Sequence, residues 1–131
     1  MINGSEDERR TIRVVVADDH DALRRALLAL LRAEPDLEVV GEATDGQEAV
    51  ELALLTKPDV VLMDVSMPHC NGVEATRGMR AELPEVRVVG LSMYGGESMA
   101  SLMIEAGAAA YLPKDAPYEA VVAAIRGESF P

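Results

Sequence analysis

VVLMDVSMP at Val60–Pro68 predicts a buried strand that ends in one carboxylate, Asp64, before the chain turns at a proline. Four apolar residues in a row suit a central strand of a parallel sheet, because helices cover both faces of such a strand. In open parallel sheets, ligands bind outside the carboxyl ends of the strands. Asp64 is therefore expected where chemistry takes place. A lone aspartate there is more often a loop or helix cap, so the neighbouring strand ends must decide between the two.

Strand-like and helix-like segments alternate on both sides of this stretch. Apolar runs predict further strands at residues 12–17, 37–43, 86–91 and 108–112. Helical spacing of apolar residues predicts helices at residues 21–33, 45–55, 71–81, 97–106 and 117–126. Asp45 with Glu48 resembles a capping box at the start of the second helix, and Gly107 suits the end of the fourth. This alternation over short loops is typical of an α/β fold with a parallel sheet and right-handed crossovers.

The distribution of polar side chains along the sequence predicts which positions are exposed to solvent. Residues 37–43 alternate between apolar and polar side chains, as an edge strand should. The arginines of the first helix, Arg24, Arg25 and Arg32, are most simply its solvated face. We expect His20 to belong to the first turn of that helix and not to bind a ligand.

The composition indicates a single acidic domain. With 131 residues the chain can bury a core without disulfides or metals. Its formal net charge of −11 disfavours direct contact with nucleic acid and with anionic membranes. The single cysteine, Cys70, fits a reducing cytoplasmic compartment. Residues 1–10 lack an apolar signal segment and are expected to form a disordered tail, and the longest apolar run, Ala26–Leu31, is too short to cross a bilayer.

Polar side chains follow several predicted strands at the point where each strand ends. The first strand is followed by Asp18 and Asp19, the third by Asp64, the fourth by Ser92 and the fifth by Lys114. With the strand order 2-1-3-4-5, these ends lie at one edge of the sheet. Two carboxylates ~4 Å apart repel by about 4 kcal/mol at an effective dielectric constant of about 20, so either their pKa values rise or a cation binds. A carboxylate-rich site of oxygen ligands favours Mg²⁺.

Mg²⁺ and Lys114 together would neutralise three carboxylates and allow a phosphoryl group to enter. The metal and the ammonium would then bear the charge that develops during phosphoryl transfer. Asp64, as the central carboxylate, is the expected nucleophile, and the product is an aspartyl phosphate. Ser92 could donate a hydrogen bond to a phosphoryl oxygen.

The chain resembles a response-regulator receiver domain of two-component signalling over nearly its whole length. The matching segments are VADDH (16–20), LMDVSMP (62–68), NGVE (71–74), LSMY (91–94) and GAAAYLPKD (107–115). The Asp-Asp-His start and the Tyr-Leu-Pro-Lys-Asp ending resemble most the NarL/FixJ (LuxR-type) class. Each motif is weak alone, but together and in order they form a specific combination. The resemblance implies a flavodoxin-like (βα)5 fold with the strand order 2-1-3-4-5 and helices on both faces.

The resemblance also implies roles for the site residues. Asp64 would accept a phosphoryl group from the phosphohistidine of a sensor histidine kinase. Mg²⁺ would be held by Asp18, Asp19, Asp64 and the backbone carbonyl of Ser66, while Lys114 would contact the phosphoryl group. The domain would catalyse its own phosphorylation and slow dephosphorylation, so we expect a phosphorylation switch and not an enzyme.

Two further pairs of residues take their roles from the same resemblance. Ser92 and Tyr111 are implied to form the switch, in which the aromatic ring moves inward when Ser92 is drawn toward the phosphoryl group. Ser66 and Tyr94 stand where the family tunes the rate of autodephosphorylation.

Two features depart from the family pattern. The family often has an apolar residue where Pro113 stands, and a proline fixes φ and removes a donor, so we expect the fifth strand to end early or the Lys114 loop to differ. The last helix is also short for this class. We expect residues 11–127 to form the receiver domain and residues 128–131 to begin a linker or end the chain, with no helix-turn-helix present. Kinship alone implies control of transcription through a DNA-binding domain outside this chain, and it also allows a homodimer.

Three alternatives stay open at this point. A phosphohydrolase that forms an aspartyl phosphate typically needs a second carboxylate two residues after the nucleophile, where this chain has Ser66. A nucleotide-binding or flavin-binding domain would need glycines after the first strand, where this chain has Asp18 and Asp19. A stand-alone or degenerate interaction domain, without DNA-binding output, would be expected to have lost some of the key positions, and here all of them are filled.

Overall fold

A parallel sheet with the strand order β2-β1-β3-β4-β5 organises the described part of the chain. The computed structural model describes residues 11–65, 72–92 and 97–128. Its strands are β1 (Ile12–Ala17), β2 (Leu37–Ala43), β3 (Val60–Asp64), β4 (Arg87–Ser92) and β5 (Ala110–Pro113). Its helices are α2 (Asp21–Arg32), α3 (Gly46–Thr56), α4 (Gly72–Glu82), α5 (Glu97–Glu105) and α6 (Tyr118–Arg126). The predicted element order and strand order are confirmed.

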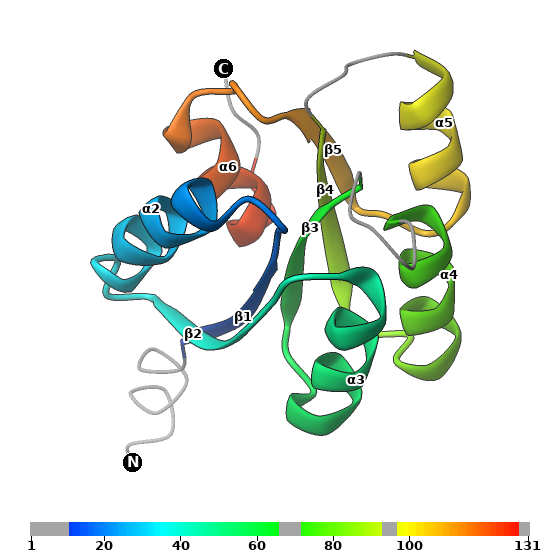
Figure 1. The fold of residues 1–131 in the computed structure, drawn as a ribbon, viewed down its shortest axis with the longest axis horizontal. Helices are drawn as coiled ribbons and strands as arrows, with labels where there is room; N and C mark the ends of the chain where they lie inside the picture. The colour runs from blue at the N-terminus through cyan, green and yellow to red at the C-terminus, as the bar shows by residue number, and fades with distance from the viewer. Residues whose placement is uncertain (1–10, 66–71, 93–96, 129–131) are drawn as a thin grey trace.

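Helices cover both faces of the sheet. Figure 1 shows α2 and α6 on one face and α3, α4 and α5 on the other. Each face has its own apolar cluster, built mainly from valine, leucine, alanine and methionine. None of the helices in the described ranges has the length and hydropathy that a bilayer-spanning segment requires.

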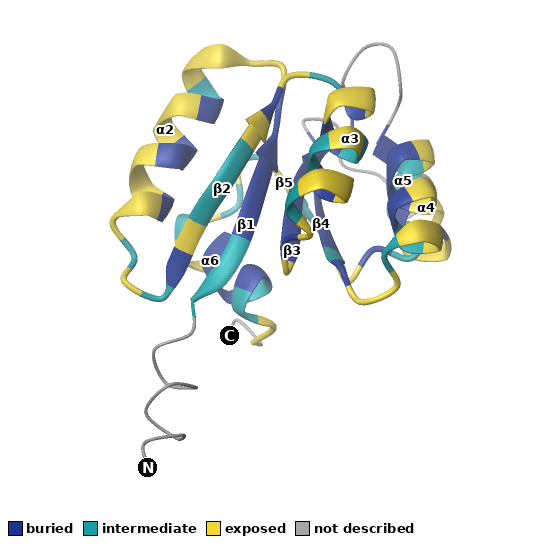
Figure 2. Cartoon of the chain, turned by 90° about the horizontal axis from the view of Figure 1, so that it is seen from below, coloured by how far each residue is buried: buried dark blue, intermediate teal, exposed yellow. Residues whose placement is uncertain are grey.

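The central strand β3 contributes to both clusters. All five of its residues are buried, in agreement with the prediction from the apolar run (Figure 2). Val61 and Met63 pack beneath α3, α4 and α5, whereas Val60 and Leu62 pack beneath α2 and α6. Because alternate residues of a strand point to opposite faces, the strand is fixed from both sides and its last residue, Asp64, is held at the sheet edge.

The predicted N-cap of α3 and the predicted glycine after α5 are confirmed, although Glu48 accepts from the residue before the N-cap and not from the N-cap itself. Asp45 is the N-cap of α3, and its Oδ1 accepts a hydrogen bond of 2.8 Å from the Glu48 N–H. The Glu48 side chain accepts in return from the Thr44 N–H at 2.7 Å. Gly107 follows α5 with a φ of 109°, a left-handed value that a glycine adopts without the steric cost of a Cβ atom.

The edge strand β2 does not show the predicted alternation of exposed and buried residues. Its pairing with β1 shifts between Val14 and Val15, so that Val15 lies opposite Gly41. A Cβ atom at Gly41 would lie 2.6 Å from Leu52 Cδ2, which shows how closely α3 approaches the strand there. The irregularity changes which side of the strand each residue faces, and this explains why the period-two pattern fails.

Pro113 does not end the fifth strand early, so that part of the expectation is wrong, whereas the alternative, a different Lys114 loop, stays a prediction. Pro113 is the last residue of β5 and lies opposite Ser92, and the following Lys114 N–H donates to Ser92 O at 2.9 Å. Because β5 is at the edge of the sheet, a residue without an N–H group can be accommodated where its nitrogen does not face the neighbouring strand. The predicted tail at residues 1–10 and the positions Ser66, Cys70 and Tyr94 lie outside the described residues.

Candidate functional site

The carboxyl ends of β1, β3 and β5 bring two acids and one amine together. Asp18 directly follows β1, Asp64 ends β3 and Lys114 directly follows β5. Lys114 Nζ lies 2.9 Å from Asp64 Oδ2 and 3.3 Å from each carboxylate oxygen of Asp18. The exposed fractions of the three side chains are 0% for Asp64, 2% for Asp18 and 4% for Lys114. Ionic groups this deeply buried interact far more strongly than a surface pair.

The position of Asp18 is fixed by its backbone and by one of its side-chain oxygens. Its N–H donates to Ala43 O at 3.0 Å, and its carbonyl accepts from Arg24 Nη1 at 2.9 Å. Its Oδ1 accepts from the His20 N–H at 2.8 Å. Its Oδ2 is buried and makes no hydrogen bond within the described ranges, although the Lys114 ammonium is near. A buried carboxylate oxygen that accepts no hydrogen bond has lone pairs with which it can bind a cation.

Asp19 is the more exposed acid of the pair, with 32% of its side chain accessible. Burial, and after it the nearby Asp64 carboxylate, raises the pKa of Asp19. Two anionic carboxylates in one crevice disfavour each other, so protonation of one of them relieves the repulsion. A divalent cation would relieve the same repulsion and keep both carboxylates charged.

His20 is the N-cap of α2, and its ring lies against the acids. His20 Nδ1 is 3.3 Å from Asp18 Oδ1, 3.4 Å from Asp19 Oδ1 and 3.1 Å from Lys114 Nζ. One ligand atom from each of Asp18, Asp19, His20 and Asp64 fits within a span of 4.8 Å. The sequence pattern assigned His20 only to a helical turn. Its place directly after the two strand-end acids was the signal that could have drawn attention to the ring.

The donor set fits a hard divalent cation. It consists mainly of carboxylate oxygens, one of them buried without a hydrogen bond in the described structure, and such oxygens are the usual ligands of Mg²⁺. The Lys114 ammonium lies among the same groups, within 3.3 Å of Asp18, His20 and Asp64, so one cation of the protein already offsets part of the acidic charge.

Ser92 and Tyr111 lie on the two strands beyond β3. Ser92 is 2% exposed at the end of β4, and its carbonyl accepts the Lys114 N–H. Tyr111 lies opposite Gly90 and packs against the cluster beneath α3, α4 and α5. The phenolic oxygen of Tyr111 is buried and has no hydrogen-bond partner among the described residues.

Arg24 is buried, so its assignment to a solvated helix face is wrong. It is 7% exposed, and its guanidinium contacts Glu42 Oε1 at 2.9 Å and Asp21 Oδ1 at 2.8 Å besides Asp18 O. The hydrogen bond to Glu42, followed by that to Asp21, raises the pKa of Arg24. Arg24 lies on the apolar stripe of α2, because the other buried residues of the helix follow it at spacings of three, four and seven. The buried residues of this stripe are Arg24, Leu27, Leu28 and Leu31.

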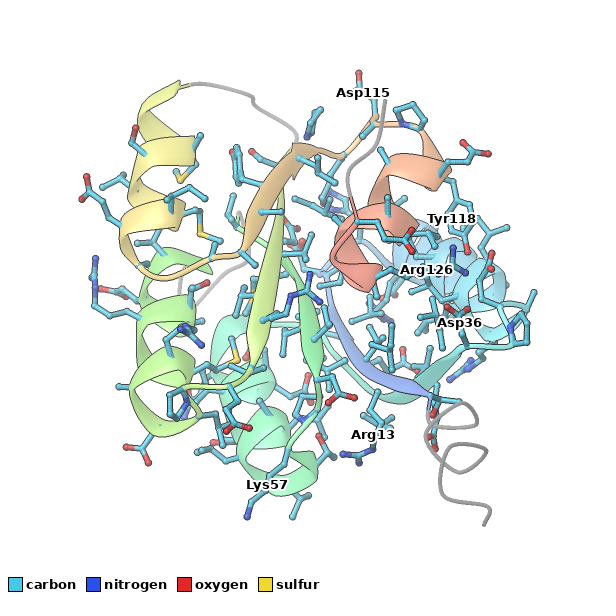
Figure 3. All side chains as sticks on the ribbon, turned by 180° about the vertical axis from the view of Figure 1, so that it is seen from behind. Arg13, Asp36, Lys57, Asp115, Tyr118 and Arg126 are labelled. Atoms are coloured by element: carbon cyan, nitrogen blue, oxygen red, sulfur yellow. The ribbon has the colours of Figure 1, made fainter. Side chains whose placement is uncertain are left out.

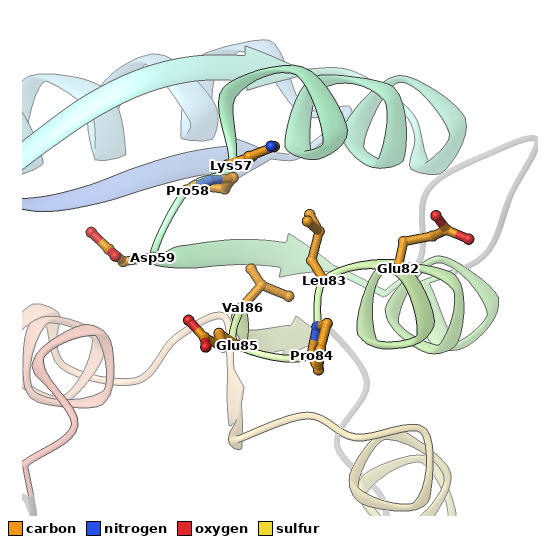
Figure 4. Close-up of a pocket in the computed structure, with 8 residues that line it drawn as sticks. All are labelled: Lys57, Pro58, Asp59, Glu82, Leu83, Pro84, Glu85 and Val86. Atoms are coloured by element: carbon orange, nitrogen blue, oxygen red, sulfur yellow. The ribbon is translucent and has the colours of Figure 1, made fainter.

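A separate hollow lies at the other end of the strands, where they begin. It has a volume of about 330 Å³ and lies where β3 and β4 begin (Figure 4). Its lining includes the carboxylates of Asp59, Glu82 and Glu85 and the side chain of Lys57. Because β3 separates this hollow from Asp64, it takes no part in the site described above.

Comparison with known proteins gives a consistent result. A family model described as the response regulator receiver domain matches residues 14–126. The chain is 41% identical over 115 residues to the transcriptional regulatory protein DegU of Brevibacillus brevis, covering 88% of the chain and 49% of that protein. It is 42% identical over 118 residues to the transcriptional regulatory protein LiaR of Bacillus subtilis, covering 90% of the chain and 56% of that protein. The chain thus spans about half the length of these curated relatives.

A solved structure shares the fold over nearly the whole chain. The signal receiver domain of the response regulator NarL from Mycobacterium tuberculosis superposes with a TM-score of 0.83 at 35% sequence identity. The match covers 91% of this chain and 99% of that domain. The residues matched by the family model include Asp18, Asp64 and Lys114.

Proposed function

Since the chain belongs to the response regulator receiver domain family, we propose that Asp64 accepts a phosphoryl group from a histidine kinase and that its phosphorylation switches the conformation of the domain. The observation that carries this proposal is the contact of 2.9 Å between the buried Asp64 carboxylate and the Lys114 ammonium. Asp64 also ends the central strand, where a ligand can approach the sheet edge.

The transfer step uses the groups that surround Asp64. A carboxylate oxygen of Asp64 attacks the phosphorus of a kinase phosphohistidine, the phosphorus–nitrogen bond breaks, and its electron pair returns to the imidazole. Lys114 remains beside the new phosphoryl oxygens, and the Ser92 hydroxyl donates to one of them. Binding of Mg²⁺ by Asp18, Asp19, Asp64 and the Ser66 carbonyl would supply the positive charge that phosphoryl transfer requires.

Release and signalling involve further residues. Water attack on the acyl phosphate returns the domain to its first state, and Ser66 and Tyr94 are proposed to set that rate. Ser92 and Tyr111 are proposed to pass the change in charge at Asp64 to the α5–β5 face. The phenolic oxygen of Tyr111 is buried and has no hydrogen-bond partner within the described ranges. This supports the proposal that the ring has two positions, because no hydrogen bond described here fixes it in the present one.

The proposed output is control of transcription. The relatives DegU and LiaR are named as transcriptional regulatory proteins, and about half of each lies beyond the match to this chain. We assign residues 11–127 to the receiver unit, with residues 128–131 leading toward an output domain. A cytoplasmic location, a sensor histidine kinase as partner and a homodimer fit the same proposal.

Phosphorylation in the presence of Mg²⁺ tests the central claim. The protein is incubated with acetyl phosphate and Mg²⁺, and intact mass together with peptide mapping should find one hydroxylamine-labile phosphoryl group on Asp64. Asp64→Asn should abolish the adduct. Asp59→Asn is the matched control at the other end of β3, since an amide oxygen can still accept from the Arg13 N–H. An adduct that persists in Asp64→Asn, or none in the parent protein, contradicts the assignment.

A further inference from the structure

Arg24 connects three segments behind the acidic cluster. Its three contacts are to the Asp18 carbonyl just after β1, to Glu42 near the end of β2 and to Asp21 in the first turn of α2. The contact to the Asp18 carbonyl is itself buried. The planar guanidinium suits this arrangement, because its fixed fork of five donors can serve several acceptors at once.

The peptide groups of Asp18 are consequently held from two sides. The N–H of Asp18 donates to Ala43 O on β2, and its carbonyl accepts from Arg24 on α2. The backbone of the β1–α2 connection has little freedom to rotate at this point. The side chains of Asp18 and Asp19 leave this connection in the direction of Asp64, as their distances to the shared His20 ring show.

We infer that Arg24 is a positioning residue for the metal and phosphoryl site: by holding the Asp18 carbonyl, it directs the carboxylates of Asp18 and Asp19 toward a shared cation. Arg24 itself touches neither the cation nor the phosphoryl group. This inference rests on the proposed function, because it assumes that the acidic cluster binds Mg²⁺. Residues outside the first coordination sphere that orient ligands are known to determine affinity in other metal sites.

Charge and position predict opposite effects for the loss of Arg24. A guanidinium near the cluster repels a divalent cation, so its removal should strengthen Mg²⁺ binding if charge alone mattered. If Arg24 orients the ligands, its removal should weaken Mg²⁺ binding. Arg24→Lys keeps the charge and cannot reproduce the three-way contact, so it isolates the geometric contribution.

The experiment measures the Mg²⁺ dissociation constant of the whole chain by calorimetry and by amide chemical shifts, without any phosphodonor. We expect both Arg24→Lys and Arg24→Met to raise the dissociation constant by about tenfold. Arg25→Lys and Arg25→Met are the matched controls, since Arg25 is the exposed neighbour on the same helix. These controls should leave the constant unchanged or lower it slightly.

A loss of stability alone must be separated from a loss of ligand orientation. Val122→Ala is the stability control, because Val122 is buried in α6 and contributes to the apolar cluster only. It should lower the melting temperature and leave Mg²⁺ affinity unchanged. If Arg24→Met does not fold, Arg24→Lys decides the matter.

Each result has a definite consequence. Folded Arg24 variants that bind Mg²⁺ as well as the parent protein, or more tightly, overturn the positioning role. A parent protein that binds no Mg²⁺ refutes the proposed function instead, and the two failures are thereby distinguished. Weaker Mg²⁺ binding by Arg24→Lys with normal binding by Arg25→Lys supports the inference.

Discussion

At the scale of single residues, Lys114 is the cation that makes the acidic crevice stable without a metal. Its ammonium has three N–H donors, and acceptors from Asp64, Asp18 and His20 lie within 3.3 Å of Nζ. Removing this cation leaves two buried carboxylates that repel each other, and a bound divalent ion could compensate for it.

Lys114→Met should therefore destabilise the metal-free protein by about 3 kcal/mol, since it leaves buried charge without a partner. Urea unfolding with and without Mg²⁺ measures this, and added Mg²⁺ should stabilise the variant more than the parent protein. Lys57→Met, at the exposed other lysine of the chain, is the control. Equal responses of the two variants to Mg²⁺ would refute the compensation.

Tyr118 is a second residue whose environment has a measurable effect. Burial, followed by the hydrogen bond of its hydroxyl to Glu34, raises the pKa of Tyr118 to about 12. The same hydroxyl also lies 3.0 Å from Leu30 O. The folded state therefore retains the phenolic proton at pH values where the unfolded chain, with a pKa near 10.0, has lost it.

Stability should consequently fall as the pH rises from the unfolded pKa of 10.0 through the folded pKa of about 12. The absorbance of the phenolate, followed against pH, should show a titration step near pH 12 in the parent protein. Tyr118→Phe should remove that step. An identical titration curve for the variant would contradict the assignment.

At the scale of elements, the start of α4 lies unusually close to the strand that bears Asp64. Gly72 begins this helix, and a Cβ atom there would lie 2.5 Å from Val65 Cα. Gly78 lies on the same helix and has open space around it. The two glycines form a matched pair for mutation, since Gly72 permits close packing against Val65, whereas a Cβ atom at Gly78 would enter open space.

Gly72→Ala should destabilise the protein by about 2 kcal/mol, because the backbone next to Asp64 must move to admit a methyl group. Gly78→Ala should stabilise it by up to about 1 kcal/mol, since alanine favours a helix interior more than glycine does. Chemical denaturation of both variants measures the difference. Destabilisation of equal size at the two positions would contradict this packing argument.

At the scale of the whole molecule, one ion cluster joins the last helix to the loop before β2. Arg126 contacts both carboxylate oxygens of Asp36, at 2.7 and 2.8 Å, and Glu34 at 3.0 Å. Figure 3 shows Asp36, Tyr118 and Arg126 on this side of the molecule. The hydrogen bond from Arg126 lowers the pKa of Asp36 below its usual 3.8.

Because the folded-state pKa of Asp36 is lowered, its contribution to stability is present above pH 3.8 and is lost as the pH falls through the lowered value. The contribution should stay below about 1 kcal/mol, since 44% of the Asp36 side chain is exposed and water screens the pair. Asp36→Asn should remove it, as urea unfolding at a series of pH values would show. An unchanged pH dependence of stability in this variant would contradict the account.

Much of this molecule follows from its sequence, and the exceptions have physical causes. The apolar run before Asp64 predicts a strand covered by helices on both faces. The strand order then brings Asp18 and Lys114 close to Asp64. Helical spacing places Arg24 on the apolar stripe of α2, but the charge partner that allows an arginine to be buried there, Glu42, lies on another element and is not visible in the pattern of the helix. The irregular pairing at Gly41 depends on contact with α3, which no local pattern records.

The division of the core between the two faces of the sheet has a practical consequence for protein engineering. Val61 packs with one set of helices, whereas Leu62, the next residue of the same strand, packs with the other set. Within the described residues the two apolar clusters have no buried residue in common, so the free energies of substitutions that lie far apart on the two sides should add. Libraries for each side could thus be selected separately and the best variants combined in a single gene.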